Sequence, residues 1–244
     1  MEAVMHLFDQ SACADIFELA SCAFTYPDAA FADAVASGAF ANAWDSALRQ
    51  AFAASTNDRS ESDSRIAACR ALESINSEPS AIDGKRDQRV PAAPPKPPTD
   101  NPEETLHQLR RAYTNTFLNM PHPLVSPYES AWAIPGKPLL FTNDTCEAVK
   151  AAYREQGLEP STLQEPADHI AYELGFFALA LRDEGCFAAS QAFWRDHLGQ
   201  WVKRLCRAVV DAQTPFYAQL CNDLQAICAA ANERMNEEVA SDVS

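Results

Sequence analysis

An aspartate and a histidine stand side by side at Asp168 and His169, directly before a strongly apolar stretch. A carboxylate beside an imidazole suits general acid–base catalysis or a zinc centre, and Glu173 follows four residues later on the same helical face. A hydrolytic zinc centre needs a third ligand, usually in a compact motif such as H-E-x-x-H, which is absent. The residues alone therefore favour a first-turn aspartate beside a hydrogen-bonded histidine. A metal-dependent hydrolase that uses Asp168, His169 and Glu173 is the alternative.

Other catalytic and nucleotide-binding motifs are missing from the sequence. It contains no G-x-S-x-G, no G-x-x-x-x-G-K-[ST] and no G-x-G-x-x-G. His197 lies between Phe193 and Trp201 at steps of four residues, on an apolar helical stripe. This position predicts a core histidine with satisfied hydrogen bonds. The sequence therefore gives no positive support for an enzyme.

A loop rich in proline and aromatic residues, "SPYESAW", suggests binding. It carries Tyr128 and Trp132 and follows a helical stripe with Tyr113 and Phe117. Such aromatics more often belong to the core, but in a proline-stiffened loop they can line a groove for an apolar peptide. The chain has 19 basic and 34 acidic residues and a net charge of -15. This charge disfavours nucleic acid and anionic membranes and favours a cationic partner.

The elements that must position these residues are helices. Apolar residues recur at helical spacing, glycine is scarce and alternating strand patterns are almost absent, so the fold class is all-α. Asn101 is expected to cap a helix that begins at Pro102. Another helix should begin at Pro166, with Asp168 in its first turn, and end at Gly185. The remaining predicted helices cover 3–24, 29–53, 143–156 with an end at Gly157, and two C-terminal segments around 193–210 and 215–233.

The helical pattern is interrupted between residues 55 and 101 by a stretch rich in Ser, Asp and Pro. Its composition predicts a disordered insertion within one all-helical domain that spans residues 1–236, followed by an acidic tail at 237–244. The N-terminus lacks the features of a secretory signal, and no run of 18 apolar residues occurs. The expected location is therefore the cytoplasm, without stable membrane insertion.

Three segments together resemble the TorD/DmsD family, cytoplasmic chaperones of molybdenum-cofactor oxidoreductases that are also called redox enzyme maturation proteins, in the NarJ-like superfamily. The segments are "RRAYTNTFLNMPHPLVSPYESAW", "QEPADHIAYELGFFALAL" and "AFWRDHLGQW" followed by "PFYAQL". They keep the order and approximate spacing of the family. The chain departs from the family in its long insertion and at Gly175 and Phe176, where the family often has an acidic and a bulky apolar residue.

The resemblance implies an all-helical bundle of the TorD-like type that is not an enzyme. It would bind the twin-arginine signal peptide and catalytic subunit of an oxidoreductase of the dimethyl-sulfoxide or trimethylamine-N-oxide reductase type and assist its maturation before export. No cofactor is expected; the family is also linked to guanine-nucleotide binding and to domain-swapped dimers, besides monomers. The residues that the resemblance assigns to peptide binding are Tyr113, Phe117, Pro127, Tyr128, Glu129, Ser130, Trp132, Glu165, Asp168 and His169.

Overall fold

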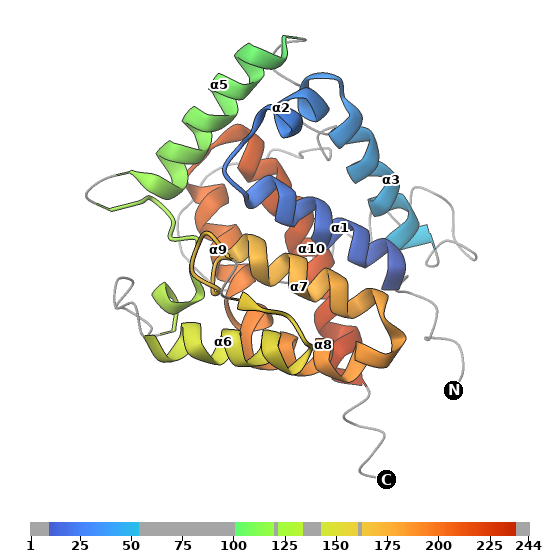
Figure 1. The fold of residues 1–244 in the computed structure, drawn as a ribbon. Coiled ribbons are helices and arrows are strands. Elements are labelled where there is room, and N and C mark those ends of the chain that lie inside the picture. Colours follow the sequence, from blue (N-terminus) through green and yellow to red (C-terminus); the bar gives the residue numbers. More distant parts are fainter. Residues whose placement is uncertain (1–9, 54–100, 120–121, 134–142, 161–162, 238–244) are drawn as a thin grey trace, which may run out of the picture.

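The computed structural model of the protein describes residues 10–53, 101–119, 122–133, 143–160 and 163–237 (Figure 1). These residues form helices and turns without a β-strand, so the predicted all-α bundle is confirmed. The predicted insertion at 55–101 lies outside the described residues except for Asn101, as do residues 238–244 of the predicted tail. The α-helices are α1 (Gln10–Phe24), α2 (Ala29–Ala36), α3 (Ala39–Ala53), α5 (Pro102–Tyr113), α6 (Asn143–Glu155), α7 (Ile170–Arg182), α8 (Phe187–Phe193), α9 (Gly199–Asp211) and α10 (Pro215–Glu237).

The core is built around α1 and α7, which run side by side through the middle of the molecule (Figure 1). The predicted stripe of α7 is buried, with Leu174 and Phe177 at 0% exposure. Gly175 allows the close approach of the two helices, because a Cβ there would lie 3.0 Å from Ser21 Oγ of α1. The Ser21 hydroxyl in turn donates a hydrogen bond to the Ala171 carbonyl (2.7 Å). Glycine at this position is therefore explained by helix packing.

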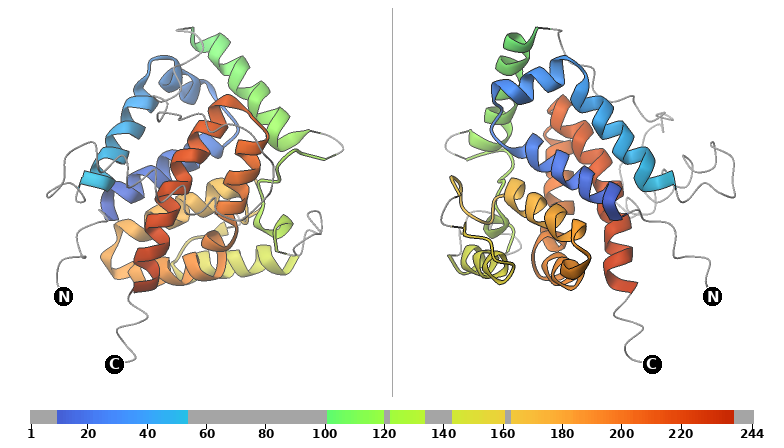
Figure 2. Two further views of the ribbon diagram at one scale, coloured as in Figure 1. Left: turned by 180° about the vertical axis from the view of Figure 1, so that it is seen from behind. Right: turned by 45° about the vertical axis from the view of Figure 1, so that its right-hand side comes forward.

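The other helices surround this pair. Figure 2 shows α9 and α10 packed against each other on the far side, while α3 contacts α1 and α2 contacts α5. Deeply buried aromatic and aliphatic side chains from α1, α7, α9 and α10 form one continuous core. None of the described helices has the length and apolar character needed to span a bilayer.

The predicted helix over 29–53 is wrong in one respect: it is two helices, α2 and α3. Gly38 lies between them with a φ of 77°, a left-handed conformation that suits glycine and breaks a helix. The sequence does not indicate this break, because the alanine-rich segments on both sides of Gly38 favour helix. Gly157, which was expected to end a helix, has a φ of 76° and lies two residues after the last residue of α6.

Two helices contain π-turns. Helix α5 begins as predicted, with the Asn101 side chain accepting a hydrogen bond from the Glu103 N–H (3.0 Å), and continues beyond Tyr113 as the π-turn η2 (Thr114–Leu118). A second π-turn, η6 (Trp194–Leu198), joins α8 to α9. Single π-turns inside α-helices often occur at functional sites. The π-turn η2 directly follows Tyr113, and η6 contains His197, and both residues belong to the region described next.

Candidate functional site

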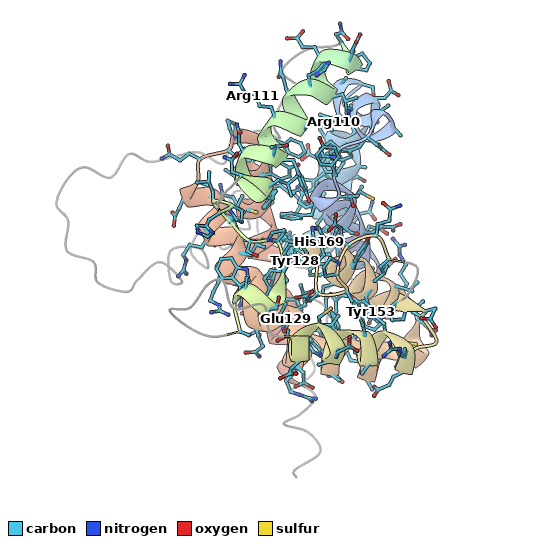
Figure 3. The ribbon with its side chains drawn as sticks, turned by 60° about the vertical axis from the view of Figure 1, so that its left-hand side comes forward. Arg110, Arg111, Tyr128, Glu129, Tyr153 and His169 are labelled. Carbon is cyan, nitrogen blue, oxygen red and sulfur yellow. The ribbon has the colours of Figure 1, made fainter. Side chains whose placement is uncertain are left out.

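Two of the segments singled out in the sequence meet at one isolated antiparallel bridge between Tyr128 and His169. The Glu129 N–H donates to the Asp168 carbonyl (2.9 Å), and the Ile170 N–H donates to the Pro127 carbonyl (2.8 Å). Figure 3 shows Tyr128 beside His169, with Glu129 close by. The bridge therefore joins the proline-aromatic loop to the start of α7 and brings the predicted residues of both segments together.

The buried Asp168 side chain links the two segments of this junction through a hydrogen bond. Its side chain is 1% exposed, and Oδ2 accepts a hydrogen bond from the Ser130 N–H (3.1 Å), which lies in the short 3-10 helix η3 (Glu129–Ala131). The predicted helix start at Pro166 is wrong: α7 begins at Ile170, and His169 is its N-cap. The residues before it form a turn in which the His169 N–H bonds to the Pro166 carbonyl (3.0 Å). Asp168 therefore bonds to the loop and not to the first turn of the helix.

Removing the Asp168 acceptor should cost stability. Asp168→Ala leaves the Ser130 N–H buried without a partner, so we expect the free energy of unfolding to fall by about 2 kcal/mol. Asp168→Asn keeps a carbonyl oxygen in the same place, and its loss should be under about 1 kcal/mol. Urea denaturation of both variants checks this order, and equal losses would contradict the role of Asp168 as acceptor.

His169 is a neutral, fully engaged side chain. It is 3% exposed, and Nδ1 accepts a hydrogen bond from the Ala171 N–H (3.2 Å). The proton of the neutral ring must then be on Nε2, which lies 3.4 Å from the Tyr113 hydroxyl. Burial lowers the pKa of His169 to about 4, although the neighbouring Asp168 carboxylate opposes this effect.

These bonds bear on the hydrolase alternative. A histidine binds a metal ion through a free lone pair, and the one on His169 Nδ1 is used to cap α7. Glu173 is fully buried, and its Oε2 accepts a hydrogen bond from Trp201 Nε1 (3.0 Å). In the part of the chain that the structure describes, no group of three or more His, Cys, Asp or Glu residues is arranged to hold a metal ion. The geometry therefore gives this alternative no support.

A buried polar cluster lies behind the bridge. Glu129 is 8% exposed and its Oε2 lies 3.1 Å from His197 Nδ1, so the predicted core histidine has a partner. The Glu173 carboxyl lies beside that of Glu129. Burial, and next the nearby Glu129 carboxylate, raise the pKa of Glu173 well above its ordinary value. This buried cluster, defined as Glu129, Glu173, His197 and Trp201, connects η3, α7, η6 and α9.

Five rings form an aromatic row from the α1–α2 connection to α7. Neighbours in the row are Tyr26 and Tyr113, with ring centroids 5.4 Å apart, Tyr128 and His169 at 5.2 Å, and His169 and Tyr172 at 5.9 Å. Tyr113 joins the two parts through its contact with His169. Tyr26 is 48% exposed, whereas Tyr128 and Tyr172 are half-buried. The row therefore presents apolar surface at its two ends.

One carboxylate stands at the end of the aromatic row. Glu165 is exposed, and its Oε2 accepts a hydrogen bond from the Tyr128 hydroxyl (3.0 Å). Burial, and next the negative charge of Glu165, raise the pKa of Tyr128. The Tyr172 hydroxyl accepts hydrogen bonds from the Gln164 and Glu165 N–H groups, both at 3.2 Å, and so fixes the segment that carries Glu165. One acid and two tyrosines, Glu165, Tyr128 and Tyr172, are thus held together at this edge.

Two predicted site residues do not belong to the exposed part of the aromatic row. Phe117 is 2% exposed and packs on Tyr113 of the row, with ring centroids 5.0 Å apart, and on Phe24 and Tyr217 in the core. Trp132 has other neighbours: its Nε1 donates to the Ser126 carbonyl (3.1 Å), and the Arg204 guanidinium stands over its ring at 5.7 Å. Pro127, Glu129 and Ser130 are buried in the junction itself. Most of the predicted residues are therefore internal, and Tyr128, Trp132 and Glu165 are the more exposed ones.

Sequence reasoning missed several members of the site. Tyr172 lies three residues after His169, a helical spacing that would have placed it on the same face. Tyr26 lies between the predicted helices over 3–24 and 29–53 and was not selected as a site residue. The partnership of Glu129 with His197 joins residues 68 positions apart, and nothing in the local pattern indicates it.

Comparisons with known proteins gave a match to one family and a similar solved structure. Residues 87–207 match the family described as the nitrate reductase delta subunit. A crystal structure of an Archaeoglobus fulgidus protein assigned as a redox enzyme maturation protein is similar with a TM-score of 0.46 and 16% identity, over 87% of this chain and 91% of that chain. Among curated proteins, none matches. The matched range contains every predicted site residue.

Proposed function

We propose that the protein is a maturation chaperone for a molybdenum-cofactor oxidoreductase and that it is not itself an enzyme. The observation that carries this proposal is the match of residues 87–207 to the nitrate reductase delta subunit family, since every site residue selected from the sequence lies within that range. The resemblance of the three segments to the TorD/DmsD family gives the finer form of the proposal. In that form the protein acts in the cytoplasm, as one domain over residues 1–236, and binds the twin-arginine signal peptide of the catalytic subunit before export.

The chemistry of the aromatic row suits such a peptide. A twin-arginine signal offers two guanidinium groups followed by an apolar stretch. Tyrosine rings provide faces for apolar and guanidinium groups, and a carboxylate can form a bidentate pair with arginine. The net charge of -15 adds long-range attraction for a cationic segment. The combination of Tyr26, Tyr128 and Glu165 at the surface supports recognition of arginine next to apolar bulk.

The burial of the predicted residues suggests a division of roles. We assign direct contact with the peptide to the exposed or half-buried Tyr128, Trp132 and Glu165. The buried residues of the junction would then position these side chains without touching the peptide. The residues with this positioning role are Tyr113, Phe117, Pro127, Glu129, Ser130, Asp168 and His169.

Calorimetric titration with a signal peptide tests the proposal. An Arg-Arg peptide should bind roughly tenfold tighter than its Lys-Lys counterpart, because lysine cannot form the planar bidentate pair that arginine forms. Glu165→Gln should weaken binding of the Arg-Arg peptide by about fivefold, a typical loss for one charge at the rim of an interface.

The control for Glu165→Gln is Glu233→Gln, which removes the same charge from an exposed position on α10. This variant should bind like the unchanged protein. Equal affinity for the Arg-Arg and Lys-Lys peptides would contradict recognition of arginine. Equal behaviour of the two variants would contradict the assignment of Glu165 and leave the chaperone proposal intact.

A further inference from the structure

Glu173 is a buried acid whose two carboxyl oxygens differ in their hydrogen bonding. Its side chain is 0% exposed, and Oε2 accepts the hydrogen bond of Trp201 Nε1. Its other oxygen, Oε1, is also buried, and no residue that the structure describes donates a hydrogen bond to it. An ionised carboxylate in this place would leave half of its charge unpaired in a medium of low dielectric constant, which is costly.

The neighbouring side chain is itself an acid. Glu129 lies within hydrogen-bonding reach of the Glu173 carboxyl, and it already accepts from His197 Nδ1 on its other side. Two adjacent carboxylates repel each other, whereas one neutral acid and one carboxylate form a strong O–H···O⁻ bond. A proton on Glu173 therefore removes the repulsion and gives Oε1 a partner at the same time.

We propose that Glu173 is a neutral carboxylic acid whose hydroxyl donates to the Glu129 carboxylate and so positions the loop that carries Tyr128 and Ser130. The result is a series of three hydrogen bonds: the Trp201 N–H donates to Glu173, the Glu173 O–H donates to Glu129, and His197 donates to the same Glu129 carboxylate. It fixes η3 to α7, η6 and α9 from the inside. Only the effect on peptide binding rests on the proposed function; the protonation of Glu173 does not.

Several titratable groups face the pair from the elements packed around it. Asp168 approaches from the segment before α7, Tyr153 from α6 and His197 from η6. The Tyr153 hydroxyl donates to the Ala167 carbonyl (3.0 Å). Asp168 adds negative charge and so opposes ionisation of Glu173 further, after the effects of burial and of Glu129.

The pH dependence of unfolding tests the proposal on the full chain. Above about pH 4.5 the unfolded chain has lost the Glu173 proton, while the folded protein keeps it, so folding binds one proton more. The contribution of Glu173 to the stability of the unchanged protein must then fall as pH rises. Glu173→Gln keeps a neutral donor and does not titrate. Between pH 5 and 8, the unfolding constant of the unchanged protein should rise relative to that of the variant by up to tenfold per pH unit.

Parallel pH profiles for the two proteins would overturn the proposal. A second measurement covers the case in which the variant does not fold. In the unchanged protein labelled with ¹³C at the glutamate carboxyl, one NMR resonance should keep the chemical shift of a neutral acid at pH 6. Ionised shifts for all glutamates at pH 6 would equally overturn it.

Peptide titration examines the positioning role separately. Glu173→Gln should bind the Arg-Arg peptide as the unchanged protein does, while Glu173→Leu, which cannot donate to Glu129, should bind at least fivefold more weakly. Asp223→Asn is the control, since Asp223 is a half-buried acid that also accepts a hydrogen bond from a tryptophan N–H, that of Trp44 (3.0 Å), but it lies on α10. A binding loss for Asp223→Asn equal to that for Glu173→Leu would refute a specific role for Glu173. If the unchanged protein binds no peptide, the proposed function fails while the pH and NMR results still decide the state of Glu173.

Discussion

Gly199→Ala should lower the free energy of unfolding by about 3 kcal/mol, although alanine is normally the better helix former. Gly199 has a helical φ of -64°, and in an ordinary helix the exchange would stabilise by up to about 1 kcal/mol. Here the Gly199 N–H closes the π-turn by bonding to the Trp194 carbonyl. A Cβ at this position would lie 2.5 Å from that oxygen and 2.8 Å from the indole ring. The steric cost must therefore outweigh the helix propensity.

The Trp194 side chain cannot move away cheaply. It is 2% exposed, and its ring packs against Phe177 with centroids 5.0 Å apart and against Phe17 at 6.2 Å. Urea denaturation measures the loss directly. The control is Gly185→Ala, where a Cβ would meet only the exposed Asp183 carboxylate at 3.2 Å and the change should stay within about 0.5 kcal/mol. A Gly199→Ala variant as stable as this control would contradict the described π-turn.

Acid should destabilise the protein through His169. The folded protein keeps this ring neutral down to about pH 4, whereas the unfolded chain protonates it near pH 6.5. The unfolded state therefore binds more protons in this window, so stability falls as pH decreases from 6.5 to 4. The difference between the two pKa values corresponds to about 3 kcal/mol, fully lost below pH 4.

Substitution isolates the contribution of His169. Asn is a good N-cap residue and can accept the Ala171 N–H, but it does not titrate, so His169→Asn should lack this acid-dependent loss. At neutral pH the variant should show only a constant cost from the missing contact with Tyr113. His107→Asn, at an exposed position on α5, serves as control and should retain the full acid dependence. The measurement is the free energy of unfolding of each protein at pH 7, 5 and 4. The same pH dependence for His169→Asn and the unchanged protein would contradict the role of His169 in the acid-dependent loss.

Glu173 and His169 act in opposite directions along the pH scale. Folding favours the protonated form of Glu173 and the neutral form of His169. The contribution of Glu173 to stability therefore decreases as pH rises, whereas that of His169 decreases as pH falls. The stability of the unchanged protein can therefore look flat between pH 5 and 6.5 although both groups contribute. Only the difference between each variant and its parent separates them.

The helical architecture could be predicted from the sequence because it depends on local signals. The cap at Asn101 and the apolar stripe of α7 each follow from residues within a few positions of one another. The break at Gly38 was missed because a single glycine in an alanine-rich stretch is compatible with either one helix or two. The start of α7 was misplaced by four residues, since both Pro166 and His169 stand in positions that suit a helix start.

The candidate site could be predicted only as a set of residues. The resemblance of the segments selected Tyr128, Asp168 and His169, and the structure brings them together at the bridge. Which of them are buried depends on tertiary neighbours such as Trp201 and His197, which are distant in sequence. Periodicity within a segment does not say what packs on it, so exposure, tautomer and hydrogen-bond partners required the folded chain.

The π-turn η6 also stores one residue of chain length. Its hydrogen bond spans five residues where an α-turn spans four, so deleting one residue from 194–198 would still permit a continuous helix. Such a deletion removes the extra residue of the turn, so α8 and α9 should keep nearly their present angular positions. Trp201 would then stay beside Glu173, and Arg204 would stay over Trp132. Deleting one residue from the regular turns of α9 would instead rotate the rest of that helix by about 100°. The segment 194–198 should therefore tolerate a one-residue deletion that α9 itself should not.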